Sequence, residues 1–161
     1  MPTWQSRVIT HADGDAEVRV TSLPGQHAPR PFGYLVPPVM GSLLNFSRGG
    51  HRRLRLYITG DTLMHGGIRE IAQRFGDIDL CLIRLGGTRI AGILLTMDAR
   101  QGVEALRVVA PREVIPIHYD DYTLFKSPLS DFRKAADQAG LPSVVHYLDR
   151  GDSYRLGPPE H

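Results

Sequence analysis

The sequence predicts an α+β domain in which a mixed β-sheet carries helices on one face. In the first half of the chain, apolar residues alternate with polar ones, which is the two-residue period of a strand with one buried face. After residue 61, short apolar strands alternate with segments whose apolar residues recur every three or four positions, as in amphipathic helices. The chain has no internal repeat, so one helix-covered sheet is the simplest architecture.

Turn residues divide the first half into strands. We expect strands over residues 4–10, 17–21, 32–36 and 54–59. The first two are joined through Asp13-Gly14, a sequence typical of β-hairpins. Residues 41–53 are ambiguous, because their apolar residues could extend a strand and Gly49-Gly50 indicates a turn.

The second half predicts three helices between short strands. The first helix contains Ile68 and ends near Gly76, and the second runs from a cap at Asp98 to about Val109, with Gln101 placed as in a capping box. The third begins at Ser127-Pro128, because proline suits the first helical position. The expected strands are residues 78–85, 114–117, 144–148 and 153–156.

Length and charge limit the classes of function. We expect a single domain over residues 1–156 and a flexible tail over residues 157–161. The 19 basic and 17 acidic residues give a net charge of +2, which predicts neither nucleic-acid nor membrane binding. Arginines such as Arg84, Arg89 and Arg100 are interpreted as parts of solvated faces.

The single cysteine, Cys81, lies inside an apolar segment and is interpreted as a buried packing residue rather than a nucleophile. One cysteine excludes an internal disulfide and suits a reducing compartment. The N-terminal residues Met1-Pro-Thr-Trp-Gln lack the basic and apolar regions of a signal peptide, so we expect a cytoplasmic protein.

Three polar residues stand where apolar strands end, at His27, Asp61 and His118. The stretch Leu54 to Thr62 shows the pattern best, since its alternating strand breaks at Gly60 and presents Asp61 on the turn. Imidazole and carboxylate groups are common zinc ligands. The intervals of 34 and 57 residues show no local metal-binding spacing, and a single histidine at a strand end is more often structural or solvent-facing than a ligand.

Ordered motifs raise the odds for a metal site. The stretches Val20-Thr-Ser-Leu-Pro-Gly-Gln-His27, Tyr57-Ile-Thr-Gly-Asp-Thr62 and Val114-Ile-Pro-Ile-His-Tyr119 resemble consecutive motifs of the metallo-β-lactamase superfamily, in the branch of lactonase-like and phospholipase-D-like hydrolases. The resemblance covers about residues 18–122. It implies one half, the C-terminal part, of an αββα sandwich that holds one or two metal ions, usually zinc.

The resemblance also implies roles for the three residues. His27 would bind the first metal, Asp61 would bridge both ions as the catalytic carboxylate, and His118 would bind the second. A metal-bound hydroxide would attack an ester, lactone, amide or phosphodiester. The superfamily signature His-x-His-x-Asp-His is missing from this sequence, so the implied ligand set is incomplete and zinc could bind weakly or be absent. His65, Tyr119 and Asp120 are candidate cleft residues beside these ligands.

Two functions follow as alternatives. The first is a zinc-dependent hydrolase that acts on an unknown small molecule and is completed by an N-terminal portion or by association. The second is a non-catalytic half-domain, a binding or assembly module that keeps relic ligand residues. Half a sandwich leaves one apolar sheet face open, so we expect a homodimer or pairing with a missing N-terminal half. A nucleotide-binding fold is disfavoured because Gly86-Gly87 lacks the rest of a phosphate-binding loop.

Overall fold

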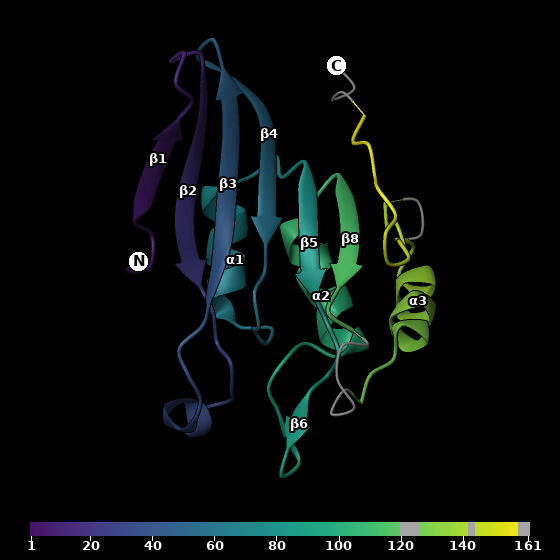
Figure 1. Cartoon of the computed structure of the whole chain (residues 1–161). Coiled ribbons are helices and arrows are strands. Elements are labelled where there is room, and N and C mark those ends of the chain that lie inside the picture. The colour runs from purple at the N-terminus through teal and green to yellow at the C-terminus, as the bar shows by residue number, and fades with distance from the viewer. Residues whose placement is uncertain (120–125, 142–143, 158–161) are drawn as a thin grey trace.

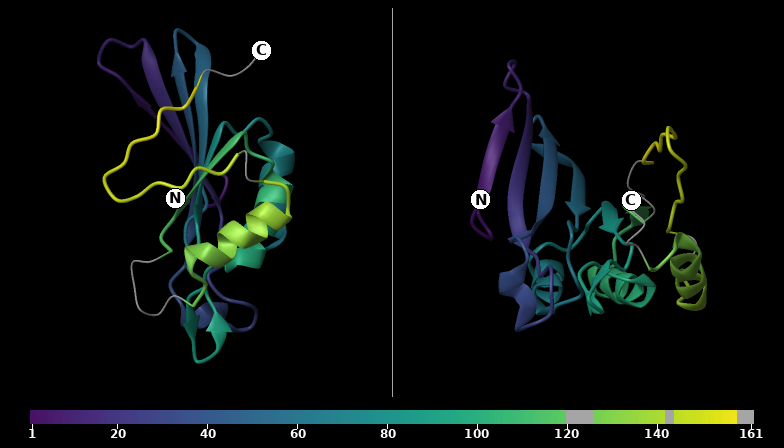
Figure 2. Two further views of the ribbon diagram at one scale, coloured as in Figure 1. Left: turned by 90° about the vertical axis from the view of Figure 1, so that its right-hand side faces the viewer. Right: turned by 60° about the horizontal axis from the view of Figure 1, so that its bottom comes forward.

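A computed structural model describes residues 1–119, 126–141 and 144–157 of the chain (Figure 1). Its centre is a six-stranded sheet in the order β1-β2-β3-β4-β5-β8, and helices α1, α2 and α3 lie on one face of that sheet (Figure 2). The predicted α+β class, with a mixed sheet and helices on one face, is confirmed. The strands of the sheet are β1 (Ser6–Thr10), β2 (Ala16–Pro24), β3 (Met40–Arg48), β4 (His51–Ile58), β5 (Leu80–Arg84) and β8 (Glu113–Ile117). The remaining elements are η1 (Phe32–Leu35), α1 (Gly66–Arg74), β6 (Arg89–Ile90), β7 (Ile93–Leu94), α2 (Ala99–Val109) and α3 (Leu129–Gln138).

The first four strands form an antiparallel meander. The predicted hairpin through Asp13-Gly14 is confirmed, since β1 pairs with β2 over the full length of β1. The ambiguous residues 41–53 complete β3 and begin β4, and Gly49 and Gly50 form the turn between them with φ angles of 57° and 75°. Both angles lie in the left-handed region that tight two-residue hairpins require.

The last three strands of the sheet run parallel. β4 pairs with β5, and β5 pairs with β8, so β5 lies between the other two. Helices α1 and α2 make the two crossovers that parallel neighbours need. The C-terminal ends of β4, β5 and β8 therefore meet at one edge of the sheet, which is the lower edge in Figure 1.

The two faces of the sheet differ in burial. On the helix side, Leu43, Tyr57, Cys81, Ile83 and Val114 are at most 1% exposed and form the core with the helices. This confirms the prediction that Cys81 is a buried packing residue, and its burial raises the pKa of the thiol. The alternate residues point to the opposite face and are only half-buried; they are Val18, Val20, Leu44, Phe46, Leu54, Leu56, Leu80 and Leu82. We call these eight side chains the open face.

Capping residues in the sequence predict the starts of α2 and α3 to within one or two residues. The Asp98 side chain accepts a hydrogen bond of 3.0 Å from the backbone N–H of Gln101, so the predicted cap is confirmed. The capping box is not completed, because Gln101 Oε1 accepts a hydrogen bond from the backbone N–H of Met64 instead. Pro128 is the N-cap of α3 rather than its first helical residue, and the helix begins one position later.

Three predicted strands are wrong. Residues 32–35 form a short 3₁₀ helix, η1, and the side chain of Tyr34 is 80% exposed. The prolines on both sides of this segment favour a turn over a strand. Residues 144–148 make a single bridge, between Val145 and Val114. Residues 153–156 form no strand, and the chain there runs beside the β8 edge of the sheet (Figure 1).

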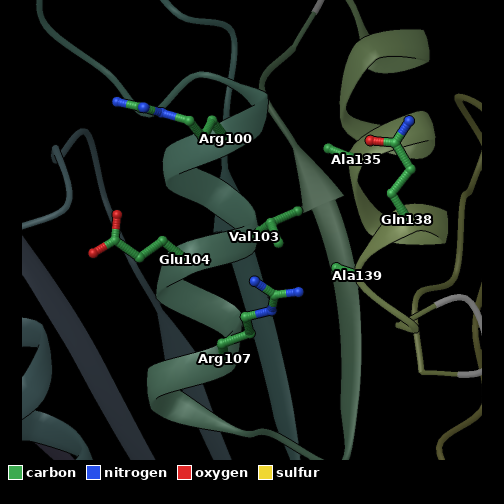
Figure 3. A pocket seen from close by; sticks show the side chains of 7 residues that line it. All are labelled: Arg100, Val103, Glu104, Arg107, Ala135, Gln138 and Ala139. Atoms are coloured by element: carbon green, nitrogen blue, oxygen red, sulfur yellow. The ribbon is translucent and has the colours of Figure 1, made fainter.

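A groove of about 520 Å³ runs between α2 and α3 on the helical side (Figure 3). Val103, Ala135 and Ala139 line it with apolar atoms, and Arg100 and Arg107 flank it. None of the predicted site residues lines this groove, so the candidate site lies elsewhere. The helices in the described part of the chain are too short and too polar to cross a membrane.

Candidate active site at the edge of the sheet

The edge at which β4, β5 and β8 end brings the three predicted ligand residues together. Asp61 follows β4, His118 follows β8, and the loop after β2 carries His27 to the same place. These residues are 34 and 57 positions apart in the sequence, and the parallel arrangement of β4 and β8 closes the larger interval. The structure confirms that the three residues gather at one edge, as their shared position at strand exits predicts.

Gly60 makes the turn that presents Asp61. Its φ angle is +69°, and a Cβ atom at this position would lie 2.3 Å from the carbonyl oxygen of Met40. Only glycine satisfies both the left-handed backbone and the close approach of β3. The strand therefore has to turn here, and Asp61 stands at a fixed place beyond its end.

Thr62 ties the Asp61 turn to the His27 loop. Its Oγ1 accepts a hydrogen bond of 2.8 Å from the backbone N–H of Gln26, and the N–H of Leu63 donates to the Gln26 carbonyl oxygen at 2.8 Å. Thr62 is 1% exposed, so these bonds are shielded from water. The His27 loop and the Asp61 turn consequently form one structural unit.

His27 is held by the backbone of Asp61. The His27 Nδ1 atom lies 3.1 Å from the Asp61 carbonyl oxygen, which can only accept a hydrogen bond. Nδ1 must therefore carry the proton, and the lone pair of the neutral ring is on Nε2. Metal-binding histidines commonly have this arrangement, with one nitrogen donating to a carbonyl group and the other left to bind the ion.

The Asp61 carboxylate lies between two nitrogen groups. Its Oδ1 atom is 3.1 Å from Arg84 Nε and 3.9 Å from His118 Nδ1. Asp61 Oδ1 and Arg84 Nε are shielded from solvent, and neither has a well-aligned hydrogen bond in the described part of the chain. Asp61 Oδ1 is thus a buried anionic oxygen whose charge is met by an ion pair.

Arg84 is the site residue that the sequence analysis missed. It was interpreted as part of a solvated face, but its side chain is 29% exposed and pairs with Asp61. Arg84 is the last residue of β5, and its backbone N–H donates to Thr59 Oγ1 at 3.0 Å. The rule that selected Asp61 and His118, a polar residue at the exit of an apolar strand, did not select Arg84, because Arg84 lies inside the predicted strand of residues 78–85.

His118 has an unusual backbone. Its φ angle is +58°, in the left-handed region that few non-glycine residues adopt. Such a conformation costs on the order of 1–3 kcal/mol and persists where the surrounding structure fixes it. The turn places a ring that is 17% exposed 3.9 Å from Asp61 Oδ1.

His65, a candidate cleft residue, caps a helix. It is the N-cap of α1, and its Nδ1 accepts a hydrogen bond of 3.1 Å from the backbone N–H of Gly67. Its neutral ring therefore carries the proton on Nε2, the nitrogen that would have to bind a metal. His65 and His27 line one pocket of about 370 Å³, and burial lowers the pKa of His65.

The other candidate cleft residues add little. Tyr119 donates a hydrogen bond of 3.3 Å from its hydroxyl to the carbonyl oxygen of Leu148, and its ring packs against the core. Asp120 lies outside the described residues. We call the group formed by His27, Asp61, Arg84 and His118 the polar edge.

These residues suit part of the ligand set of a metal ion. The lone pair of His27 Nε2 and the buried Asp61 Oδ1 are the donor types that zinc prefers. In the described ranges, however, no group of three or more His, Cys, Asp or Glu side chains lies close enough to hold an ion. The chain presents partial metal-binding chemistry at this edge and does not complete a metal site with its described residues.

Comparison with known proteins agrees with this geometry. The family described as the beta-lactamase superfamily domain matches residues 1–119. A UPF0173 metal-dependent hydrolase of Archaeoglobus fulgidus is 34% identical over 103 residues, which are 64% of this chain and 42% of that protein. The UPF0173 metal-dependent hydrolase of Pyrococcus furiosus is 26% identical over 140 residues, 87% of this chain and 56% of that protein.

Solved structures share the fold at lower identity. The isothiocyanate hydrolase from Delia radicum gut bacteria superposes with a TM-score of 0.75 at 16% identity, covering 92% of this chain and 58% of that one. Igni18, a metallo hydrolase from Ignicoccus hospitalis, superposes with a TM-score of 0.60 at 21% identity, covering 84% of this chain and 51% of that one. The chain spans about half the length of these relatives.

The family match covers most of the chain, and the sheet, its helices and the polar edge all fit the same fold. The chain therefore belongs to the metallo-β-lactamase superfamily.

Proposed function

We propose that this chain supplies one part of the active site of a metal-dependent hydrolase. The observation that carries the proposal is the convergence of His27, Asp61 and His118 at one edge of the sheet, with His27 held by the Asp61 backbone. The relatives whose names include metal-dependent hydrolase support the same class of reaction. Zinc is the first candidate, because imidazole and carboxylate groups are its usual ligands.

His27, Asp61 and His118 would hold the ion. A divalent ion bound there supplies Lewis acidity toward a carbonyl or phosphoryl oxygen. The chain positions its own groups without the ion: Thr62 joins the two loops, Gly60 fixes the Asp61 turn and the left-handed backbone directs His118. Esters, lactones, amides and phosphodiesters are the substrates to test, because each presents such an oxygen.

The remaining ligands have to come from outside the described residues. The site lies beside the open face of the sheet, since Arg84 follows Leu80 and Leu82 on the same side of β5. A second polypeptide packed on that face would lie next to the site. We therefore propose that the active species is an assembly, either a homodimer or this chain paired with another polypeptide.

Hydrolysis assays test the proposal. The chain is incubated with Zn²⁺ and with chromogenic esters, a lactone, an anilide and bis(4-nitrophenyl) phosphate, at protein concentrations that favour association. We expect hydrolysis that a chelator abolishes and that Asp61→Ala and His118→Ala reduce at least about 100-fold, as loss of an interaction made in the transition state does. Asp13→Ala, in the exposed hairpin turn, is the matched control. Equal rates for Asp61→Ala and the unmodified chain would overturn the proposal.

A second function is favoured by one observation. Asp61 is already paired with Arg84, and the described residues offer no group of three metal ligands, as a non-catalytic binding or assembly module would allow. In that case zinc at micromolar concentration would not bind and none of the substrates would be hydrolysed. The two functions are therefore separated by the same set of measurements.

A further inference from the structure

Arg84 occupies the centre of the polar edge because of the strand order. β5 lies between β4 and β8, so the backbone of the residue that ends β5 lies between the ends of the two strands that lead to the other site residues. Those residues are Asp61 and His118. The hydrogen bond from the Arg84 backbone to Thr59 Oγ1, on a side chain that is 1% exposed, fixes the start of the arginine side chain.

The Arg84–Asp61 contact is a shielded ion pair. Arg84 Nε and Asp61 Oδ1 are 3.1 Å apart, and both atoms are buried. Arginine keeps its positive charge at any accessible pH. The two side chains are 29% and 30% exposed, but the contacting atoms are shielded, so the positive charge of the guanidinium is only partly screened from the Asp61 carboxylate.

We propose that Arg84 is a built-in counter-cation that competes with a divalent metal ion for Asp61. This inference rests on the metal site of the proposed function. A zinc ion bound to a carboxylate lies about 2.0–2.2 Å from its oxygen. With the guanidinium still in place, a doubly charged ion and a singly charged group would lie within a few ångströms of each other and repel strongly. The metal ion therefore binds only as Arg84 swings away, and the chain binds metal more weakly than its ligands alone would.

Removal of the charge tests this competition. The metal-free full chain, Arg84→Met, Arg84→Gln and Arg84→Lys are each titrated with ZnCl₂ in a calorimeter. Methionine keeps an unbranched stem without charge, glutamine keeps a hydrogen-bonding group, and lysine keeps the charge. We expect Arg84→Met and Arg84→Gln to bind zinc at least about tenfold more tightly than the unmodified chain, given the repulsion between nearby cations. Arg84→Lys should bind as weakly as the unmodified chain.

Controls restrict the effect to Asp61. Arg107→Met removes an exposed arginine from α2, on the far side of the molecule, and should leave zinc binding unchanged. The double variant Arg84→Met/Asp61→Asn should lose the gain in affinity. Circular dichroism shows which variants are folded, and Arg84→Gln replaces Arg84→Met if the latter is not. The inference is overturned if the folded neutral variant binds zinc no more tightly than the unmodified chain, including the case in which neither binds.

Thermal melting gives an independent readout. Without metal, Arg84→Met leaves the Asp61 carboxylate without its counter-charge and should melt below the unmodified chain. Saturating zinc should then raise the melting temperature of Arg84→Met more than that of the unmodified chain. Equal increases contradict the competition. Tighter zinc binding without hydrolysis of any substrate would refute the proposed function alone, and hydrolysis with unchanged zinc affinity in Arg84→Met would refute this inference alone.

Discussion

His27 Nδ1 donates a hydrogen bond to the backbone carbonyl oxygen of Asp61 across 3.1 Å, whereas His65 Nδ1 accepts one from the backbone N–H of Gly67. The two neutral rings must therefore be opposite tautomers. We predict that His27 is protonated on Nδ1 and His65 on Nε2. Long-range ¹H–¹⁵N correlation spectra at about pH 8.5, where histidines of ordinary pKa are neutral, distinguish the two forms. A proton on Nε2 of His27 would contradict its assignment as an oriented ligand.

The same bond predicts the effect of replacing His27. His27→Gln removes the Nε2 lone pair while Thr62 still joins the two loops. Zinc affinity should fall by at least about 10–100-fold. Removing only the hydrogen-bond partner of a metal-binding residue typically costs that much, and His27→Gln removes the metal-binding nitrogen itself. His11→Gln, in the exposed hairpin turn, is the matched control and should bind as the unmodified chain does. Calorimetric titration measures both, and equal loss in the two variants would show a non-specific effect.

The Gly60 turn gives a prediction about stability. Gly60→Ala forces a side chain into a left-handed backbone and places its Cβ 2.3 Å from the Met40 carbonyl oxygen. We expect a loss of about 2–4 kcal/mol in the free energy of unfolding, from backbone strain and overpacking together. Gly66→Ala is the matched control, because a Cβ there has no atom within 4 Å. Urea denaturation measures both, and a loss below about 1 kcal/mol for Gly60→Ala would contradict the predicted clash.

The parts of the fold that depend on residues adjacent in the sequence, such as turns and helix ends, could be predicted from the sequence. The Asp13-Gly14 turn, the Asp98 cap and the end of α1 before Gly76 are each specified within a few residues. Residues 32–36 have strand-like apolar residues but find no partner strand, and pairing is a tertiary property. The small β6–β7 hairpin was missed because it is only two residues long on each side.

The candidate site could be predicted only in part, for a similar reason. His27, Asp61 and His118 each follow an apolar strand, and they meet because β2, β4 and β8 run in the same direction and so end at the same edge. The role of Arg84 depends on β5 lying between β4 and β8, and the strand order is not written in any local motif. The prediction that Arg84 is part of a solvated face was wrong. Scattered arginines are usually solvated, whereas Arg84 pairs with a shielded carboxylate oxygen of Asp61.

A cluster away from the site predicts how stability depends on pH. Tyr154 donates a hydrogen bond of 2.7 Å to Glu113, and His146 also pairs with that carboxylate. Burial acts to raise the pKa of Glu113, but these hydrogen bonds outweigh it and the pKa lies below its usual value. A depressed carboxyl pKa stabilises the fold above the unfolded-state pKa of about 4.3, and this contribution is lost as the pH falls through the folded-state value.

Tyr154→Phe removes part of this contribution. The variant should melt below the unmodified chain at pH 6–7, and the difference should shrink as the pH falls below about 4.3, because protonated Glu113 no longer favours the bond. Tyr34→Phe, on a side chain that is 80% exposed, is the control and should show no difference at any pH. Melting curves from pH 7 to 3 measure both. A difference that grows toward acid pH would contradict the assigned role of Glu113.

The open face predicts self-association. Its eight apolar side chains are only half-buried, and two of them, Val18 and Phe46, line a groove of about 580 Å³ together with Ile9. Contiguous apolar surfaces larger than a few hundred Å² usually mark an interface, and a two-fold pairing of the faces would bury this one. We therefore expect dimers or larger species by light scattering at micromolar concentration.

Charge on the open face should reverse this association. Leu56→Glu lies in the middle of the face, where dimerisation would bury the carboxylate at a cost of several kcal/mol, so the dissociation constant should rise by at least about 100-fold. Ile90→Glu makes the same change on the exposed β6–β7 hairpin, away from the sheet, and should leave the dimer intact. Light scattering at several concentrations measures both. A monomer for the unmodified chain, or equal dissociation of the two variants, would show that the open face is not the surface through which the chain associates.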